Sequence, residues 1–203
     1  MKKTLTIPGP AGQLEAVLEI PDATPRAIAV ICHPHPEYGG TMNNKVVTAV
    51  SRALSELNVI NLRFNYRGVG NSEGEYAAMK GETEDAHAAI KFIKNEYPDL
   101  PLWLAGFSFG TGIVTHIAHD NPPEQLVLIA PPVKRYELKK YTWDCPTVIA
   151  LGGKDDVVDV DVIKNWQKTL TPAPTFIFFE GAGHFFHGYL IELREALVSA
   201  LET

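Results

Sequence analysis

Cysteine, long apolar runs and excess positive charge are all scarce in this 203-residue sequence, and each absence excludes a class of protein. The two cysteines, Cys32 and Cys145, do not make a disulfide framework. No apolar run approaches the roughly 18 residues that a membrane-spanning helix requires, so we expect no membrane partner. Lys and Arg number 18 against 24 Asp and Glu, and the net charge of -6 argues against a nucleic-acid partner, because phosphate neutralisation needs clustered cations.

Neither group of basic residues in the sequence indicates a targeting signal or a binding site. Two lysines stand at positions 2 and 3 without an apolar segment behind them, so the start of the chain does not look like a signal peptide. With so little cysteine, we expect a cytoplasmic protein. The one basic cluster, at residues 134–140, is interpreted as a solvated face. The length predicts a single domain over residues 1–203 that buries roughly 70–75% of its unfolded surface.

What the sequence does contain is a recurring pattern of short apolar runs followed by longer segments with helical spacing. Such alternation predicts parallel strands joined by crossover helices. We expect about eight strands, the first of those identified being antiparallel. Seven strands are assigned to residues 14–20, 27–32, 59–64, 102–106, 125–130, 147–151 and 175–179. Five helices are assigned to residues 44–57, 81–96, 109–119, 160–170 and 186–201.

The connections between these elements are short. Too few residues separate the strand ending near Ala130 from the one beginning near Thr147 to hold an inserted cap domain. We therefore expect a three-layer α/β sandwich with a mostly parallel eight-stranded sheet, no cap, and a shallow site that solvent can reach.

A candidate nucleophile lies between the strand at 102–106 and the helix that follows it. Residues 106–110 read Gly-Phe-Ser-Phe-Gly, which fits the pattern Gly-x-Ser-x-Gly. At a strand-to-helix elbow this pattern holds the serine at backbone angles that cost about 1–3 kcal/mol, and it exposes the hydroxyl. The motif alone also occurs in turns without chemistry, but the strand before it and the helix after it favour Ser108 as nucleophile. The next backbone N–H, on Phe109, can then donate to an oxyanion.

A serine hydroxyl needs a neighbouring base, and in this kind of fold the acid and the histidine follow the serine in the chain. His184 comes after the strand at 175–179 and a short glycine loop, which places it at the same sheet edge as Ser108. His187 is three residues further on, and we interpret it as a rim residue inside the last helix. His184 is therefore the predicted base.

Three carboxylates compete to orient that histidine. Asp155 follows the strand at 147–151 after a glycine turn, and we favour it as the acid that holds the imidazole tautomer. Asp156 is expected to face solvent. Asp159 is expected to cap the helix that begins at Val160.

The loop after the strand at 27–32 offers the second oxyanion donor. Pro34 and Pro36 have no N–H, so His35 between them is the predicted donor. His33 and His35 could also suggest metal ligands, but no Cys, His or Asp partner follows at ligand spacing. We therefore expect neither a metal nor a cofactor.

Four blocks of the sequence resemble a known group of enzymes. They are His-Pro-His-Pro at 33–36 with Gly-Gly-Thr-Met-Asn-Asn-Lys-Val-Val at 39–47, Asn-Leu-Arg-Phe-Asn-Tyr-Arg-Gly-Val-Gly-Asn-Ser-Glu-Gly at 61–74, the Ser108 elbow, and Gly-His-Phe-Phe-His-Gly at 183–188. Together they resemble small, capless bacterial α/β-hydrolases related to dienelactone-hydrolase and cinnamoyl-esterase-like enzymes. The resemblance spans most of the chain and implies the α/β-hydrolase fold with a serine triad. Dienelactone hydrolases proper have cysteine where Ser108 stands, and many α/β-hydrolases have proline where Asp159 stands.

These observations favour a carboxylesterase that acts on a small or exposed ester through an acyl-enzyme. A serine peptidase or thioesterase with the same triad stays open, as does a binding protein that has lost its catalysis. Glu37, Tyr38 and Tyr66 are predicted to face the substrate. Residues 65–68 are interpreted as fixing a loop.

Overall fold

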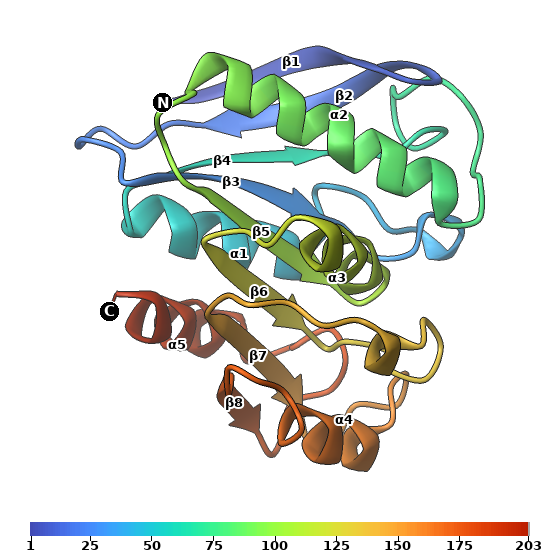
Figure 1. Cartoon of the computed structure of the whole chain (residues 1–203), viewed down its shortest axis with the longest axis vertical. Coiled ribbons are helices and arrows are strands. Elements are labelled where there is room, and N and C mark those ends of the chain that lie inside the picture. The colour runs from blue at the N-terminus through green and yellow to red at the C-terminus, as the bar shows by residue number, and fades with distance from the viewer. Residues whose placement is uncertain (203) are drawn as a thin grey trace.

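An eight-stranded sheet runs through the centre of the computed structural model, which describes residues 1–202 (Figure 1). The strands lie in the order β1-β2-β4-β3-β5-β6-β7-β8. β3 to β8 are mutually parallel, whereas β2 is antiparallel to both of its neighbours, β1 and β4. Their bounds are β1 Lys2–Gly9, β2 Gly12–Glu19, β3 Ala27–Cys32, β4 Val59–Phe64, β5 Leu102–Phe107, β6 Gln125–Ile129, β7 Thr147–Gly152 and β8 Thr175–Phe179.

Helices cover both faces of this sheet. In Figure 1, α2 (Lys80–Glu96) and α3 (Phe109–Asp120) lie in front of it, while α1 (Lys45–Glu56) and α5 (Leu190–Leu201) lie behind. α4 (Val160–Gln167) packs against β7. Because both faces are covered, every residue of β3, β4 and β7 is buried. The predicted three-layer sandwich with a mostly parallel sheet is confirmed.

The seven predicted strands are all present, but β1 was not among them. β1 pairs with β2 alone at the edge of the sheet, and most of its residues are exposed. Ile7 is its one fully buried residue. An edge strand that buries so little gives too weak an apolar pattern to be recognised.

The last helix begins at Leu190 rather than at Phe186. Phe186 has φ = 51° and Gly188 has φ = 78°, so neither has the backbone conformation of a right-handed helix. His187 between them therefore lies in an exposed loop, and its predicted place inside the helix is wrong.

The loops after the parallel strands meet at one edge of the sheet, because parallel strands all end on the same side. The segment between β6 and β7 holds only a short 3-10 helix, η2 (Leu138–Lys140), so no cap domain is inserted there. The loop after β3 holds another, η1 (Pro36–Tyr38). This edge carries every residue predicted to take part in catalysis.

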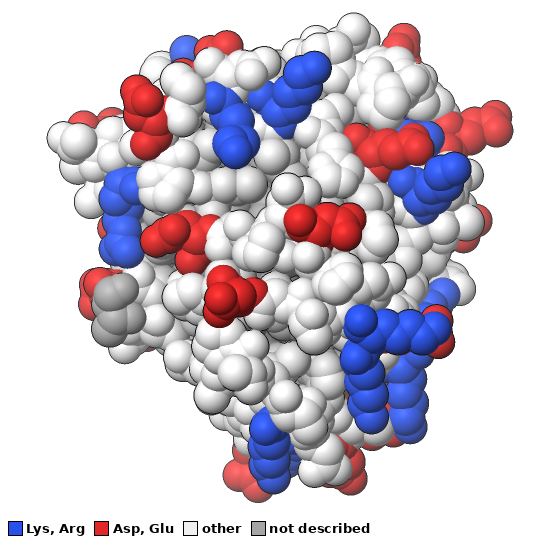
Figure 2. Space-filling model, viewed as in Figure 1, with Lys and Arg blue, Asp and Glu red and all other residues white. Residues whose placement is uncertain are grey.

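The surface gives two further observations. Within residues 1–202, no helix combines the length and the apolar character needed to cross a membrane. Figure 2 shows one face of the molecule, on which acidic and basic side chains are mixed. A group of basic side chains gathers at the lower right of that view, over the region of η2.

Candidate active site

Ser108 occupies the sharp turn between β5 and α3. Its backbone angles, φ = 51° and ψ = -117°, lie outside the regions that L-residues normally adopt. The Ser108 N–H donates to the carbonyl of Ile129 in β6 at 2.9 Å. Its own carbonyl accepts from the Thr111 hydroxyl at 2.6 Å and the Thr111 N–H at 2.9 Å. These bonds hold the strained elbow that the sequence predicts.

Two glycines allow the elbow to close. A Cβ atom on Gly106 would lie 2.5 Å from the backbone of Gly110, and one on Gly110 would lie 2.2 Å from the carbonyl oxygen of Cys32. Both distances are far below van der Waals contact with backbone atoms that cannot move aside. The start of α3 can therefore touch β5 and β3 only because neither position carries a side chain.

His184 stands between Ser108 and Asp155. Its Nε2 lies 3.0 Å from Ser108 Oγ and its Nδ1 lies 2.8 Å from Asp155 Oδ2. A carboxylate can only accept, so Nδ1 carries the proton, and Nε2 is left to accept from the serine hydroxyl. The His184 side chain is 3% exposed, and the rings of Phe107 and Phe185 each lie 5.1 Å from it. The imidazole is thus held in the orientation that a general base needs.

Asp155 is fixed by more than the histidine. Its Oδ1 accepts from the backbone N–H groups of Val157 and Val158, both at 2.9 Å, and its side chain is fully buried. Asp156, by contrast, is exposed. Of the two adjacent carboxylates, Asp155 is the one beside His184.

Asp159 has a different task. Its Oδ1 accepts from the Val162 N–H at 3.1 Å as the N-cap of α4, which confirms the predicted capping role. Its Oδ2 accepts from Lys134 Nζ at 2.6 Å.

The two predicted oxyanion donors belong to residues close to Ser108, because Phe109 follows it in the chain and His35 lines the same cavities. The His35 ring packs against the Phe109 ring at 4.9 Å between centroids. The His35 carbonyl accepts from the N–H groups of Tyr38 and Gly40, at 3.2 and 3.0 Å. Within residues 1–202, the backbone N–H groups of His35 and Phe109 have no protein acceptor. Both are therefore available to a ligand.

His33 is a structural residue. Its Nδ1–H donates to the Pro34 carbonyl at 2.7 Å, and its Nε2 accepts from the Tyr66 N–H at 3.2 Å. Complete burial lowers the pKa of His33 from 6.5 to about 3. Among residues 1–202, no group of three or more His, Cys, Asp or Glu side chains is arranged to hold a metal ion.

Burial of neutral His33 predicts a loss of stability in acid. The unfolded chain binds a proton at this histidine below pH 6.5 while the folded chain does not, so the free energy of unfolding falls as the pH falls. Between pH 7 and pH 5 the protonation of this one histidine in the unfolded chain lowers the free energy of unfolding by about 2 kcal/mol. Urea unfolding of the wild type and His33→Gln at both pH values measures the difference, and identical pH dependence in the two proteins would contradict it.

The three residues predicted to face the substrate have different fates. Tyr38 is 73% exposed and borders the site. Glu37 is exposed but lines neither of the two cavities that contain Ser108. Tyr66 is fully buried, with its ring 5.7 Å from that of Phe109, so the prediction that it faces substrate is wrong. Its buried ring packs edge-on against Phe109, the residue that follows the nucleophile.

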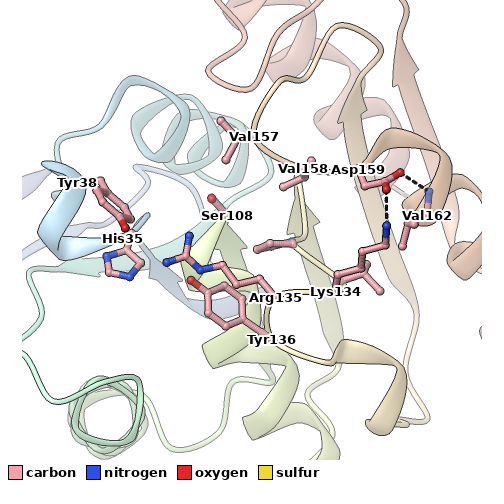
Figure 3. Close-up of a pocket in the computed structure, with 12 residues that line it drawn as sticks. His35, Tyr38, Ser108, Lys134, Arg135, Tyr136, Val157, Val158, Asp159 and Val162 are labelled. Atoms are coloured by element: carbon pink, nitrogen blue, oxygen red, sulfur yellow. Dashed lines mark hydrogen bonds and ion pairs between the residues drawn. The ribbon is translucent and has the colours of Figure 1, made fainter.

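Two cavities open on Ser108, and they share His35, Tyr38 and Val157. Cavity 1, of about 220 Å³, extends toward the segment after β6 and the start of α4 (Figure 3). Its further lining includes Lys134, Arg135, Tyr136, Val158, Asp159 and Val162. Cavity 2, of about 190 Å³, extends the other way, and its further lining includes Pro34, Gly39, Gly40, Asn44, His184 and Phe185.

The basic residues in the wall of cavity 1 differ from the solvated face that the sequence predicts for them. Lys134 and Arg135 are exposed, as expected of a solvated face, yet both line the cavity beside Ser108. Their place in the chain does indicate a position near the site. The segment that contains them follows β6, whose carboxyl end lies at the same sheet edge as the nucleophile.

Comparison with known proteins agrees with this geometry. Residues 23–142 match a family model described as serine aminopeptidase, S33. An uncharacterised protein of Rickettsia prowazekii is 33% identical over 96% of this chain and 87% of its own length.

Solved structures match the chain over nearly its whole length. An α/β serine hydrolase homologue from Coxiella burnetii is 42% identical, with a TM-score of 0.94 over 98% of this chain and 97% of that one. A lidless α/β serine hydrolase from Xanthomonas campestris is 36% identical, with a TM-score of 0.94 over 98% of this chain and 93% of that one. The chain therefore belongs to the serine aminopeptidase S33 family of α/β serine hydrolases, as one of its small members without a cap.

Proposed function

We propose that this protein is a carboxylesterase that hydrolyses small or exposed esters through an acyl-enzyme. The observation that carries the proposal is the continuous hydrogen-bond chain from Ser108 Oγ through His184 to Asp155, which ends where two cavities meet. A hydroxyl, a base and an orienting acid in this order activate a serine for attack on a carbonyl carbon.

In the first half-reaction, Ser108 Oγ attacks the ester carbonyl and His184 Nε2 takes its proton. The N–H groups of His35 and Phe109 donate to the oxyanion that forms. The imidazolium, stabilised by Asp155, then gives its proton to the alkoxy oxygen, and the C–O bond breaks. Water repeats the sequence on the acyl-enzyme with His184 again as base, so that the products are one acid and one alcohol.

The size of the site supports short substrates. Cavities of about 220 and 190 Å³ each accommodate a small acyl or alcohol group. With no cap inserted between β6 and β7, larger parts of an ester can remain in solvent. A long lipid chain would extend beyond cavities of this volume.

A substrate panel tests the proposal and its rivals. We expect p-nitrophenyl acetate and butyrate to be hydrolysed faster than the decanoate, and all three faster than acyl-CoA thioesters or aminoacyl p-nitroanilides. The anilides are included because the matching family model is described as an aminopeptidase. Faster cleavage of an anilide than of any ester would replace the esterase by a peptidase. No turnover of any activated ester by folded protein would favour a binding role.

A further inference from the structure

The position of His184 assigns the two halves of an ester to the two cavities. The leaving oxygen takes its proton from Nε2, which lies 3.0 Å from Ser108 Oγ. His184 lines cavity 2 and does not line cavity 1. The alcohol therefore departs through cavity 2, and the acyl group occupies cavity 1.

Arg135 stands at the wall of cavity 1 (Figure 3). Its guanidinium carbon lies 5.7 Å from the ring centroid of Tyr38 and 5.7 Å from that of Tyr136. Both tyrosines line the same cavity, one from the loop after β3 and one from the segment after β6. Cation–π contact with two rings restrains a long side chain that would otherwise be free in solvent.

The charge on Arg135 is not neutralised within the protein. Among residues 1–202, no ion pair joins Arg135 to a carboxylate, whereas Lys134 is paired with Asp159. The charge of Arg135 acts on a residue beside the nucleophile. The pKa of His35 is lowered first by burial and second by the positive charge of Arg135. An unpaired guanidinium on a cavity wall is a group that binds carboxylates with well-defined geometry.

Resting on the proposed esterase function, we propose that Arg135 binds a carboxylate at the far end of the acyl group. The substrate class is then a monoester of a short dicarboxylic acid. Hydrolysis breaks the bond between the acyl carbon and the alkoxy oxygen, adds the oxygen of water to that carbon, and releases a dicarboxylate and an alcohol.

Two matched esters test the proposal: mono-p-nitrophenyl adipate, which is anionic, and its methyl ester, which is neutral. The measured quantity is the ratio of kcat/KM for the anionic ester to that for the neutral one. In Arg135→Gln we expect this ratio to fall by about fivefold, the upper end of what an exposed ion pair contributes. Salt at about 0.5 M should lower the wild-type ratio by screening the same contact. Lys139→Gln is the matched control, because it removes one charge from the same segment but Lys139 does not line cavity 1.

A second pair of esters tests the assignment of the halves. In 4-carboxyphenyl acetate the anionic group is on the alcohol, and its methyl ester is the neutral counterpart. We expect Arg135→Gln to leave the ratio for this pair unchanged. A larger effect on this pair than on the adipates would overturn the assignment of the acyl group to cavity 1.

The remaining outcomes separate this inference from the function on which it rests. An adipate ratio that is the same in wild type and Arg135→Gln, or that falls equally in Lys139→Gln, would overturn the role of Arg135 while leaving the esterase intact. If the wild type fails to hydrolyse even the neutral methyl ester, the proposed function itself is overturned, and the inference falls with it.

Discussion

Replacing Ser108 with alanine is expected to lower kcat/KM for p-nitrophenyl butyrate by about 1,000-fold or more. The Ser108 hydroxyl is the group that lies 3.0 Å from His184 Nε2, and alanine leaves nothing there to attack the carbonyl. The oxyanion donors and the cavities survive the change, so a small residual rate above the uncatalysed reaction is expected. A fluorophosphonate probe should label the wild type and not the variant.

Ser199→Ala is the control for this experiment. Ser199 is an exposed residue near the end of α5 that lines neither cavity at Ser108, and its loss should change neither labelling nor turnover. Circular dichroism of both variants establishes that they are folded. Intact labelling of Ser108→Ala would show that the nucleophile is another residue.

Asp155→Asn is expected to lower kcat by about 100-fold to 10,000-fold, whereas Asp156→Asn should change it by less than about threefold. Asp155 Oδ1 is held by the N–H groups of Val157 and Val158, so an amide at this position would keep its oxygen there. Its NH₂ group would then face His184 Nδ1. That arrangement favours the tautomer with the proton on Nε2, which cannot accept a proton from Ser108.

The comparison of the two aspartates is informative because they are adjacent in the chain and carry the same charge. Asp156 is exposed, so its replacement removes a surface charge and no contact with the histidine. Steady-state kinetics on one ester, with the wild type alongside, are sufficient. Equal losses in the two variants would reject Asp155 as the orienting acid.

The parts of the fold that the sequence predicts well are the strands that carry a continuous apolar run. β3, β4 and β8 begin and end at the predicted residues, and β5 and β7 extend one residue further. In β3, β4 and β7 such a run reflects complete burial between the helices on the two faces. β8 lies at an edge and has no buried residue, but its run of Phe and Ile still marks it as a strand. β1, the strand at the other edge, has no such run, since Ile7 is its one buried residue. The start of α5 depends on backbone angles at Phe186 and Gly188 that no periodicity reveals.

The sequence likewise predicts some residues of the candidate site and not others. Ser108, Asp155 and His184 could be predicted because each lies in the turn or loop after a parallel strand and their order in the chain is that of the fold. The position of Arg135 after β6 places it at the same sheet edge, but that its side chain lines cavity 1 depends on the path of the segment between β6 and η2. Tyr66 was placed wrongly because a tyrosine near a site can lie above it or beneath it, and sequence alone does not distinguish the two.

The bonds that hold Asp155 have a consequence for how this enzyme can diversify. Val157 and Val158 hold the acid through backbone N–H groups, while the Val157 side chain is 58% exposed and lines both cavities. The backbone N–H of Val157 thus holds the catalytic acid, while the side chain of the same residue forms part of the cavity wall. Every amino acid except proline supplies that N–H, so position 157 can be varied to alter substrate choice while the triad keeps its acid, which makes it a natural target for libraries in directed evolution.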